Sequence, residues 1–91
     1  MQGDNAYFEF GFEGYRPSDG PIVDSGHANI NYYGFIDRLG NWYIMQEDTT
    51  AKSYRYIKGS PVVGDSTTTY ASNWGNRETL TYGYFDAIFG A

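Results

Sequence analysis

The middle of the chain separates into two sets of side chains that alternate with a period of two, and this alternation constrains the fold most strongly. Within residues 28–37 the even positions include Ile30 and Tyr32, whereas the odd positions include Asn29 and Asn31. Successive side chains of a strand point to opposite faces of a sheet, so the pattern predicts a strand over these residues.

Two turn signals then divide the chain into further strands. Arg38-Leu39-Gly40-Asn41 contains a glycine that suits the left-handed position of a hairpin turn with a bulge. Glu47-Asp48-Thr49-Thr50-Ala51 is the second polar turn. Strands are therefore expected at 42–47 and 52–58, so that residues 28–58 form a three-stranded antiparallel meander.

The flanking segments predict the rest of the fold. Residues 7–13 alternate as another strand, with its phenylalanines on one face. Residues 14–21 are expected to form a loop, because two prolines exclude a central strand. Residues 69–79 suit a short helix capped by a threonine, and residues 81–89 suit a closing strand. The expected fold is mainly β, a small antiparallel sheet of about five strands with one short helix near residues 69–79.

The composition agrees with a sheet. Trp, Tyr and Phe make up 20% of the 91 residues, whereas leucine occurs only as Leu39 and Leu80. Helical bundles depend on straight aliphatic side chains, while aromatic and β-branched residues suit a pleated surface. A chain of this length is expected to form one domain, residues 1–91, without a large interdomain cleft.

Charge and length disfavour several kinds of partner. The net charge of −5 opposes binding to nucleic acid and to anionic membrane surfaces. The longest apolar run, Ala87–Phe89, is too short to cross a bilayer, and the first residues lack the features of a signal peptide. The absence of cysteine excludes disulfides, thiolate zinc sites and a cysteine nucleophile, but it fixes no compartment.

One segment holds the residue types of a serine hydrolase. Asp24, Ser25 and His27 lie within four positions, and His27 is the only histidine. Adjacent side chains of an extended segment point in opposite directions, so these three residues are poorly placed to form a local triad. An exposed loop histidine is the simpler interpretation.

Carboxylates offer other chemistry. Aspartates in or near turns normally bond the local backbone, and none of them shows the spacing of a calcium loop. These aspartates are Asp4, Asp19, Asp24, Asp37, Asp48 and Asp65. A glycosidase pair would come from Glu9, Glu13, Asp37 or Glu47, but nothing in the sequence singles out two of them. We therefore expect no enzymatic activity, no metal and no cofactor.

Tyrosines are the strongest candidates for contacts with a partner. Two pairs of tyrosines are spaced by two positions, namely Tyr54 with Tyr56 and Tyr82 with Tyr84. In a strand this spacing places same-face rings about 6.8 Å apart. Such rings suit a protein interface or a sugar, with Asn29, Asn31 or Asp37 as polar neighbours. Trp42 and Trp74 are expected to anchor the core. The lysines around Tyr54 and Tyr56 are too few for nucleic acid and are expected to protect a sheet edge.

Several segments over about residues 30–85 combine turn glycines with aromatics expected to pack. They are Tyr33-Gly34-Phe35-Ile36-Asp37, Gly40-Asn41-Trp42-Tyr43-Ile44-Met45, Tyr54-Arg55-Tyr56, Gly59, Asn73-Trp74-Gly75-Asn76-Arg77 and Leu80-Thr81-Tyr82-Gly83-Tyr84-Phe85. Together these segments resemble short uncharacterised proteins of tailed bacteriophages. The resemblance implies a virion-associated or accessory protein and supplies no catalytic motif.

These features leave three functional hypotheses. The first is a non-enzymatic structural or accessory protein, in a virion if the resemblance holds, which binds itself or a larger assembly through aromatic surfaces and strand edges. The alternative is a small carbohydrate-binding module for glycan attachment. A further alternative is an immunity or inhibitor protein, which suits the size and acidity of the chain.

Overall fold

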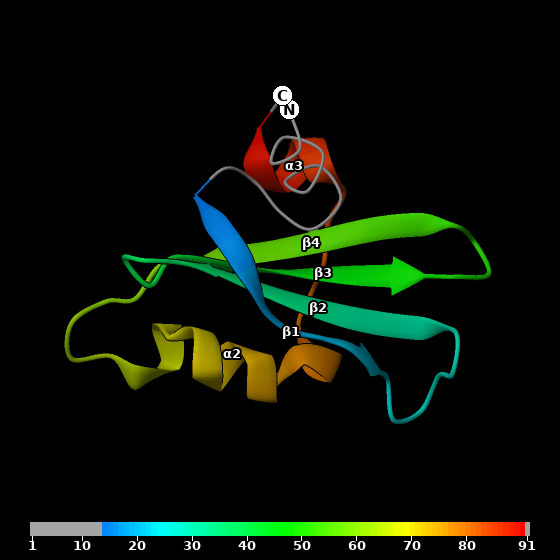
Figure 1. Cartoon of the computed structure of the whole chain (residues 1–91), viewed down its shortest axis with the longest axis horizontal. Helices are drawn as coiled ribbons and strands as arrows, with labels where there is room; N and C mark the ends of the chain where they lie inside the picture. Colours follow the sequence, from blue (N-terminus) through cyan, green and yellow to red (C-terminus); the bar gives the residue numbers. More distant parts are fainter. Residues whose placement is uncertain (1–13, 91) are drawn as a thin grey trace.

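Four consecutive strands pair in chain order into one open antiparallel sheet (Figure 1). The strands are β1 (Tyr15–Val23), β2 (Ile30–Asp37), β3 (Trp42–Asp48) and β4 (Ser53–Gly59). The structure is a computed structural model that describes residues 14–90. It confirms the mainly β fold and the meander over residues 28–58, although the described residues form a sheet of four strands and the prediction was about five.

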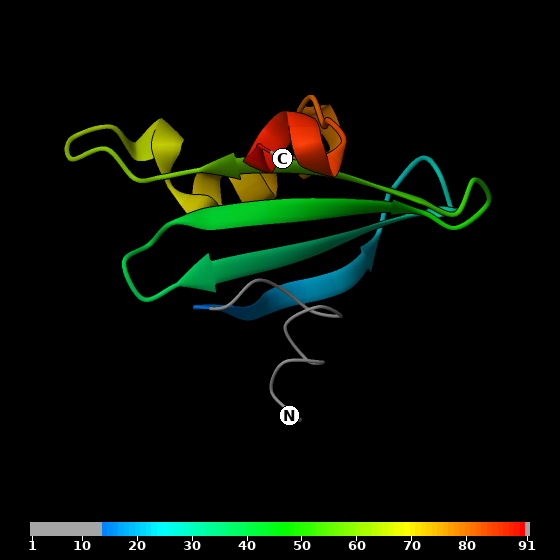
Figure 2. The same cartoon turned by 90° about the horizontal axis from the view of Figure 1, so that it is seen from above.

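The strands β2, β3 and β4 lie side by side in the sheet (Figure 2), and their regular pairing sorts their side chains onto two faces. Tyr32, Trp42 and Ile44 are buried together on one face, which we call the α2 face after the helix that covers it. Phe35 and Tyr43 are buried on the opposite, α3 face, where their rings stack with centroids 4.6 Å apart. The alternation seen in the sequence therefore supplies two small aromatic cores, one on each side of the sheet.

Short helical segments cover the α2 face. The 3₁₀ turn η1 (Ser66–Thr68), the helix α2 (Tyr70–Gly75) and the 3₁₀ turn η2 (Arg77–Thr79) follow one another. Thr69 caps α2, because its side-chain oxygen accepts a hydrogen bond from the Ser72 N–H. Partly buried residues of this region that pack on the core are Tyr70, Trp74, Leu80 and Tyr82. The helix predicted near residues 69–79 is thus present, shortened to α2 and followed by η2.

The chain changes faces at the outer edge of β4. Gly83 and Tyr56 exchange two backbone hydrogen bonds, with N···O distances of 2.6 and 2.9 Å. The helix α3 (Phe85–Phe89) then packs on the α3 face, so that α2 and α3 lie on opposite sides of the sheet (Figure 1). The prediction of a closing strand over residues 81–89 is wrong. Phe85 and Phe89 are four positions apart, so a helical turn brings both rings to Tyr56, with centroids 5.6 and 5.5 Å away.

The prediction of a loop over residues 14–21 is also wrong, because β1 occupies residues 15–21 of that range. Pro17 and Pro21 are tolerated there because β1 is an edge strand whose pairing with β2 shifts twice. Bulges free the prolines from a continuous ladder of hydrogen bonds. The strand predicted at residues 7–13 lies outside the described residues.

We predict that Trp42→Ala lowers the free energy of unfolding by about 3–5 kcal/mol. The Trp42 side chain is 3% exposed, and its Nε1–H donates to the Thr68 carbonyl oxygen at 3.0 Å. Urea denaturation followed by circular dichroism measures the change. Leu39→Ala is the control, because Leu39 is 74% exposed and its loss is expected to cost less than about 0.5 kcal/mol. A loss below about 1 kcal/mol for Trp42→Ala would contradict the core assignment.

Two glycines are expected to respond in opposite directions to alanine. A Cβ on Gly59 would lie 2.4 Å from Cζ2 of the buried Trp42, whereas a Cβ on Gly75 would meet nothing within 4 Å. Gly59→Ala should therefore destabilise the fold by about 1–3 kcal/mol through overpacking. Gly75→Ala at the end of α2 should stabilise it by roughly 0.5–1 kcal/mol. Equal changes in the two urea midpoints would show that Gly59 is not in close contact with the indole.

Candidate functional site

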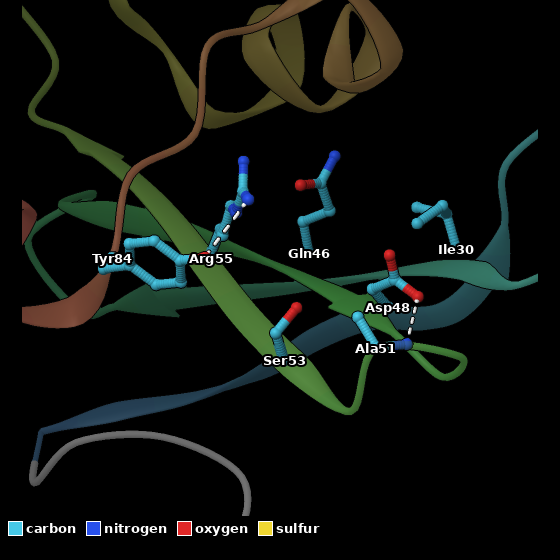
Figure 3. Close-up of a pocket in the computed structure, with 7 residues that line it drawn as sticks. All are labelled: Ile30, Gln46, Asp48, Ala51, Ser53, Arg55 and Tyr84. Atoms are coloured by element: carbon cyan, nitrogen blue, oxygen red, sulfur yellow. Dashed lines mark hydrogen bonds between the residues drawn. The ribbon is translucent and has the colours of Figure 1, made fainter.

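A polar depression lies at the β3–β4 hairpin end of the α2 face and has a volume of about 350 Å³ (Figure 3). Gln46 and Asp48 of β3 pair with Arg55 and Ser53 of β4, so the four side chains share this face. Figure 3 shows them together with Tyr84 at the side. The complete lining is Ile30, Gln46, Asp48, Ala51, Ser53, Arg55 and Tyr84.

Arg55 and Tyr84 form one wall of the depression. The Arg55 Nη2–H donates to the Tyr84 hydroxyl oxygen at 3.2 Å, and the guanidinium carbon lies 4.9 Å from the ring centroid. Tyr84 directly follows Gly83, whose backbone is fixed to Tyr56. The C-terminal segment thus places an aromatic ring beside the only cation that lines the depression among the described residues.

Asp48 forms the opposite wall and is held in a defined orientation. Its Oδ1 accepts hydrogen bonds from Asn29 Nδ2 and from the backbone N–H groups of Thr50 and Ala51, at 2.9 to 3.1 Å. The Ala51 N–H is the largest cause that lowers the pKa of Asp48, while partial burial opposes it. Hydrogen bonds from Asn29 and Thr50 and the positive charge of Arg55 lower it further. Asp48 is therefore a carboxylate at neutral pH.

The four tyrosines predicted to make contacts fall into two groups. Tyr54 and Tyr84 are 46% and 55% exposed. Tyr56 is half-buried beneath Phe85 and Phe89, and Tyr82 is half-buried with its hydroxyl donating to the Arg77 carbonyl oxygen.

Neither tyrosine pair therefore presents two exposed rings. Although Tyr54 and Tyr56 share a face, α3 covers only Tyr56. Tyr82 packs beside Tyr32, with ring centroids 5.8 Å apart, before the chain crosses the sheet edge. The two predicted core anchors lie on the α2 side, where Trp42 is buried and Trp74 is half-buried.

Exposed aromatic residues gather instead along the outer edge of β4. Tyr54 belongs to β4. Tyr84 and Phe85 directly follow Gly83, which pairs with Tyr56 of β4. We call these three residues the aromatic edge. Phe85 is 44% exposed, and the sequence did not mark it as a contact residue. Its spacing of four residues from Phe89 is the signal of a helical turn, but residues 81–89 were predicted to form a strand.

Glu47 gathers polar groups on the α3 face. Its Oε1 accepts hydrogen bonds from the Tyr33 hydroxyl at 2.9 Å and from Asn31 Nδ2 at 3.4 Å. Its Oε2 accepts one from the Tyr54 hydroxyl at 3.3 Å. Burial raises the pKa of Tyr33, and the hydrogen bond to Glu47 raises it further. These contacts hold Tyr54 by its hydroxyl and leave part of its ring exposed.

Ser25 and His27 take different partners. The Ser25 hydroxyl and backbone N–H donate to Glu78 at 2.5 and 2.8 Å, whereas His27 Nδ1 lies 3.3 Å from Asp24 Oδ1. The other Asp24 oxygen accepts from the Tyr32 hydroxyl at 2.8 Å. Ser25 is thus turned toward η2, and this contact ties the β1–β2 loop to it. Glu78 lies 53 positions away, so no local pattern could have indicated it.

The remaining carboxylates do not converge. Glu47 pairs with Asn31, which is six residues from Asp37 along β2, or about 20 Å. Asp4, Glu9 and Glu13 lie outside the described residues. Within residues 14–90, no group of three or more His, Asp or Glu side chains is arranged to hold a metal ion. The same part of the chain has no helix that is long and apolar enough to span a membrane.

We predict that the fold is lost at high pH as buried tyrosines ionise. Burial is the largest cause that raises the pKa of seven tyrosines: Tyr15, Tyr32, Tyr33, Tyr54, Tyr56, Tyr70 and Tyr82. A pKa that is higher in the folded state stabilises the fold below the unfolded value, about 10. This stabilisation is lost as the pH rises from there toward the folded values.

Parallel titrations by tyrosinate absorbance and circular dichroism measure this loss. Ionisation is expected to be delayed beyond pH of about 10 and then to accompany unfolding. A simple absorbance curve centred near pH 10, with the fold intact, would contradict the prediction.

Comparisons with known proteins indicate no function, so the function is inferred from the geometry of the described residues. No family model, no curated protein and no solved structure matches the chain. The resemblance to proteins of tailed bacteriophages therefore stays a hypothesis that rests on the motifs of residues 30–85.

Proposed function

We propose that the domain is a non-enzymatic structural or accessory protein that acts by self-association through the aromatic edge. The observation that carries this proposal is the exposure of Tyr54, Tyr84 and Phe85, at 44–55%, around the outer edge of one strand. Aromatic side chains dominate the energetics of protein interfaces because they bury a large apolar area with few rotatable bonds.

Side chains, rather than backbone pairing, are the source of this association. β1 is an edge strand among the described residues, and its two prolines and two register shifts interrupt the row of hydrogen-bonding groups along its outer side. On β4, Tyr56 is already paired with Gly83. A second copy therefore finds only short stretches of open strand, and strand addition contributes little.

The setting of this association follows from the resemblance alone. Residues 30–85 resemble proteins of tailed bacteriophages, so a virion shell or tail is the assembly in which the domain would act. The net charge of −5 agrees with a protein partner, since it opposes binding to nucleic acid.

A glycan-binding module is the second candidate, and one observation favours it. The polar depression is lined by the Tyr84 ring with the Arg55 guanidinium beside it, and also by a carboxylate, an amide and a hydroxyl. Sugar rings present apolar C–H faces and many hydroxyls, so an aromatic ring with mixed donors and acceptors suits them. This candidate does not need the paired exposed rings that the sequence suggested.

The solution mass tests self-association. Light scattering after size exclusion, over a roughly hundredfold range of concentration, should show a defined oligomer that dissociates on dilution. The double variant Tyr54→Ser/Phe85→Ser should shift the midpoint of dissociation to at least about tenfold higher concentration, because it removes two exposed aromatic contacts.

Leu39→Ser is the matched control. Leu39 is more exposed than either aromatic residue but lies in the β2–β3 turn, at the opposite end of the strands from Tyr54. It should leave the oligomer unchanged. A wild-type protein that is monomeric at every concentration, or a control that dissociates as readily as the double variant, would rule out the proposed contact.

A further inference from the structure

The polar depression contains two opposite charges that attract each other across it without direct contact. Arg55 and Asp48 are diagonal neighbours on β4 and β3, so their side chains share one face and their Cα atoms lie about 7–8 Å apart. No ion pair joins them within the described residues. A ligand between them therefore meets a positive group at one wall and a negative group at the other.

Arg55 retains most of its hydrogen-bonding capacity. Its recorded bond to the Tyr84 hydroxyl engages one of the five guanidinium N–H donors. That contact and the stacking over the Tyr84 ring also reduce the mobility of the long side chain. A guanidinium that is held in this way is suited to a carboxylate, which it can bind through two parallel hydrogen bonds.

The other walls suit hydroxyl groups. All three hydrogen bonds recorded to Asp48 reach Oδ1, so Oδ2 can accept a hydrogen bond from a ligand. The Gln46 Nε2–H is directed to the Tyr32 hydroxyl at 3.4 Å, which leaves the amide oxygen as an acceptor. Ser53 adds a hydroxyl that both donates and accepts.

A zwitterion such as a free amino acid would satisfy only the two charges. Gln46 and Ser53 would then lose water without gaining a partner, and an unsatisfied polar group weakens binding. A hydroxylated ring with a carboxylate satisfies all four groups, and it can lie against the wall that Arg55 and Tyr84 form together. The volume of about 350 Å³ is near the lower limit of ligand pockets, which favours a single ring.

We propose that this depression binds a sugar acid, a monosaccharide unit whose carboxylate pairs with Arg55 and whose hydroxyls bond Asp48, Gln46 and Ser53. This inference rests on the second candidate function and names its ligand class. Self-association through the aromatic edge does not depend on it.

Titration of the isotope-labelled protein with sodium glucuronate, followed by amide NMR, tests the proposal. Saturable shifts are expected around residues 46, 48, 53, 55 and 84. Glucose should bind at least about tenfold more weakly, because it lacks the carboxylate. Sodium acetate and glycine, at the same concentrations, should produce no saturable shifts at these residues.

Variants test whether the Arg55 guanidinium itself binds the carboxylate, or whether any positive charge on the protein has the same effect. Arg55→Gln should weaken glucuronate binding by about tenfold or more and leave the weaker binding of glucose little changed. Arg55→Lys should fall between wild type and Arg55→Gln, because it keeps the charge but loses the planar fork. Arg38→Gln is the matched control, since it removes the same charge from the exposed β2–β3 turn and should not change binding.

The possible results distinguish the sugar acid from the wider glycan-binding function. Equal binding of glucose and glucuronate would overturn the sugar acid but keep the glycan function. Binding of glycine or acetate as strong as that of glucuronate would overturn the sugar class. The absence of saturable shifts with every probe would overturn both the sugar acid and the glycan-binding function. Tyr84 also belongs to the aromatic edge, so the titration is repeated on the Tyr54→Ser/Phe85→Ser variant, which keeps the whole lining of the depression and separates these results from self-association.

Discussion

Two backbone hydrogen bonds between Gly83 and Tyr56 fix the point at which the chain passes from one face of the sheet to the other. Before this point Tyr82 completes the core of the α2 face, and after it α3 closes the α3 face. Tyr84, one residue past the bridge, can therefore reach Arg55. The core, the aromatic edge and one wall of the polar depression all depend on this crossing.

The crossing also explains how a small domain accommodates so many tyrosines. Each sheet face buries part of its rings beneath one short helix, and the hydroxyls reach carboxylates or carbonyls near the margin of the core. Tyr32, for example, is buried with its ring among apolar side chains, yet its hydroxyl donates to Asp24. Burial with a partner at the polar end is the arrangement in which tyrosine stabilises a core without an unsatisfied group.

The sequence predicted those strands that are determined by the local alternation of side chains and by the residues of the turns between them. Alternation and turn chemistry placed β2, β3 and β4 within two residues of their observed ends. β1 was missed because the proline rule excludes central strands, whereas an edge strand with bulges tolerates proline. Phe85 and Phe89 were assigned to a strand, because five residues carry too little periodicity to separate a helical turn from an aromatic strand.

The candidate site was less predictable, since its residues come together only through the sheet register and the crossing. Gln46 and Arg55 share a face because of the pairing of β3 with β4, and Tyr84 joins them from beyond Gly83. Chemical type alone marked Tyr54 and Tyr84 as contact residues and equally marked Tyr56 and Tyr82. Which of each pair is exposed depends on where α3 and η2 lie.

The interrupted edge of β1 has a consequence for the size of any assembly. A sheet with two open edges can add copies without limit and grow into a fibre, which is a hazard for a chain so rich in aromatic strands. Here the prolines and bulges of β1 obstruct one direction of growth. In the proposed self-association, a contact of the aromatic edge with the same edge of a second copy would relate the two by a two-fold axis and occupy that surface on both, so the assembly would close as a dimer instead of polymerising.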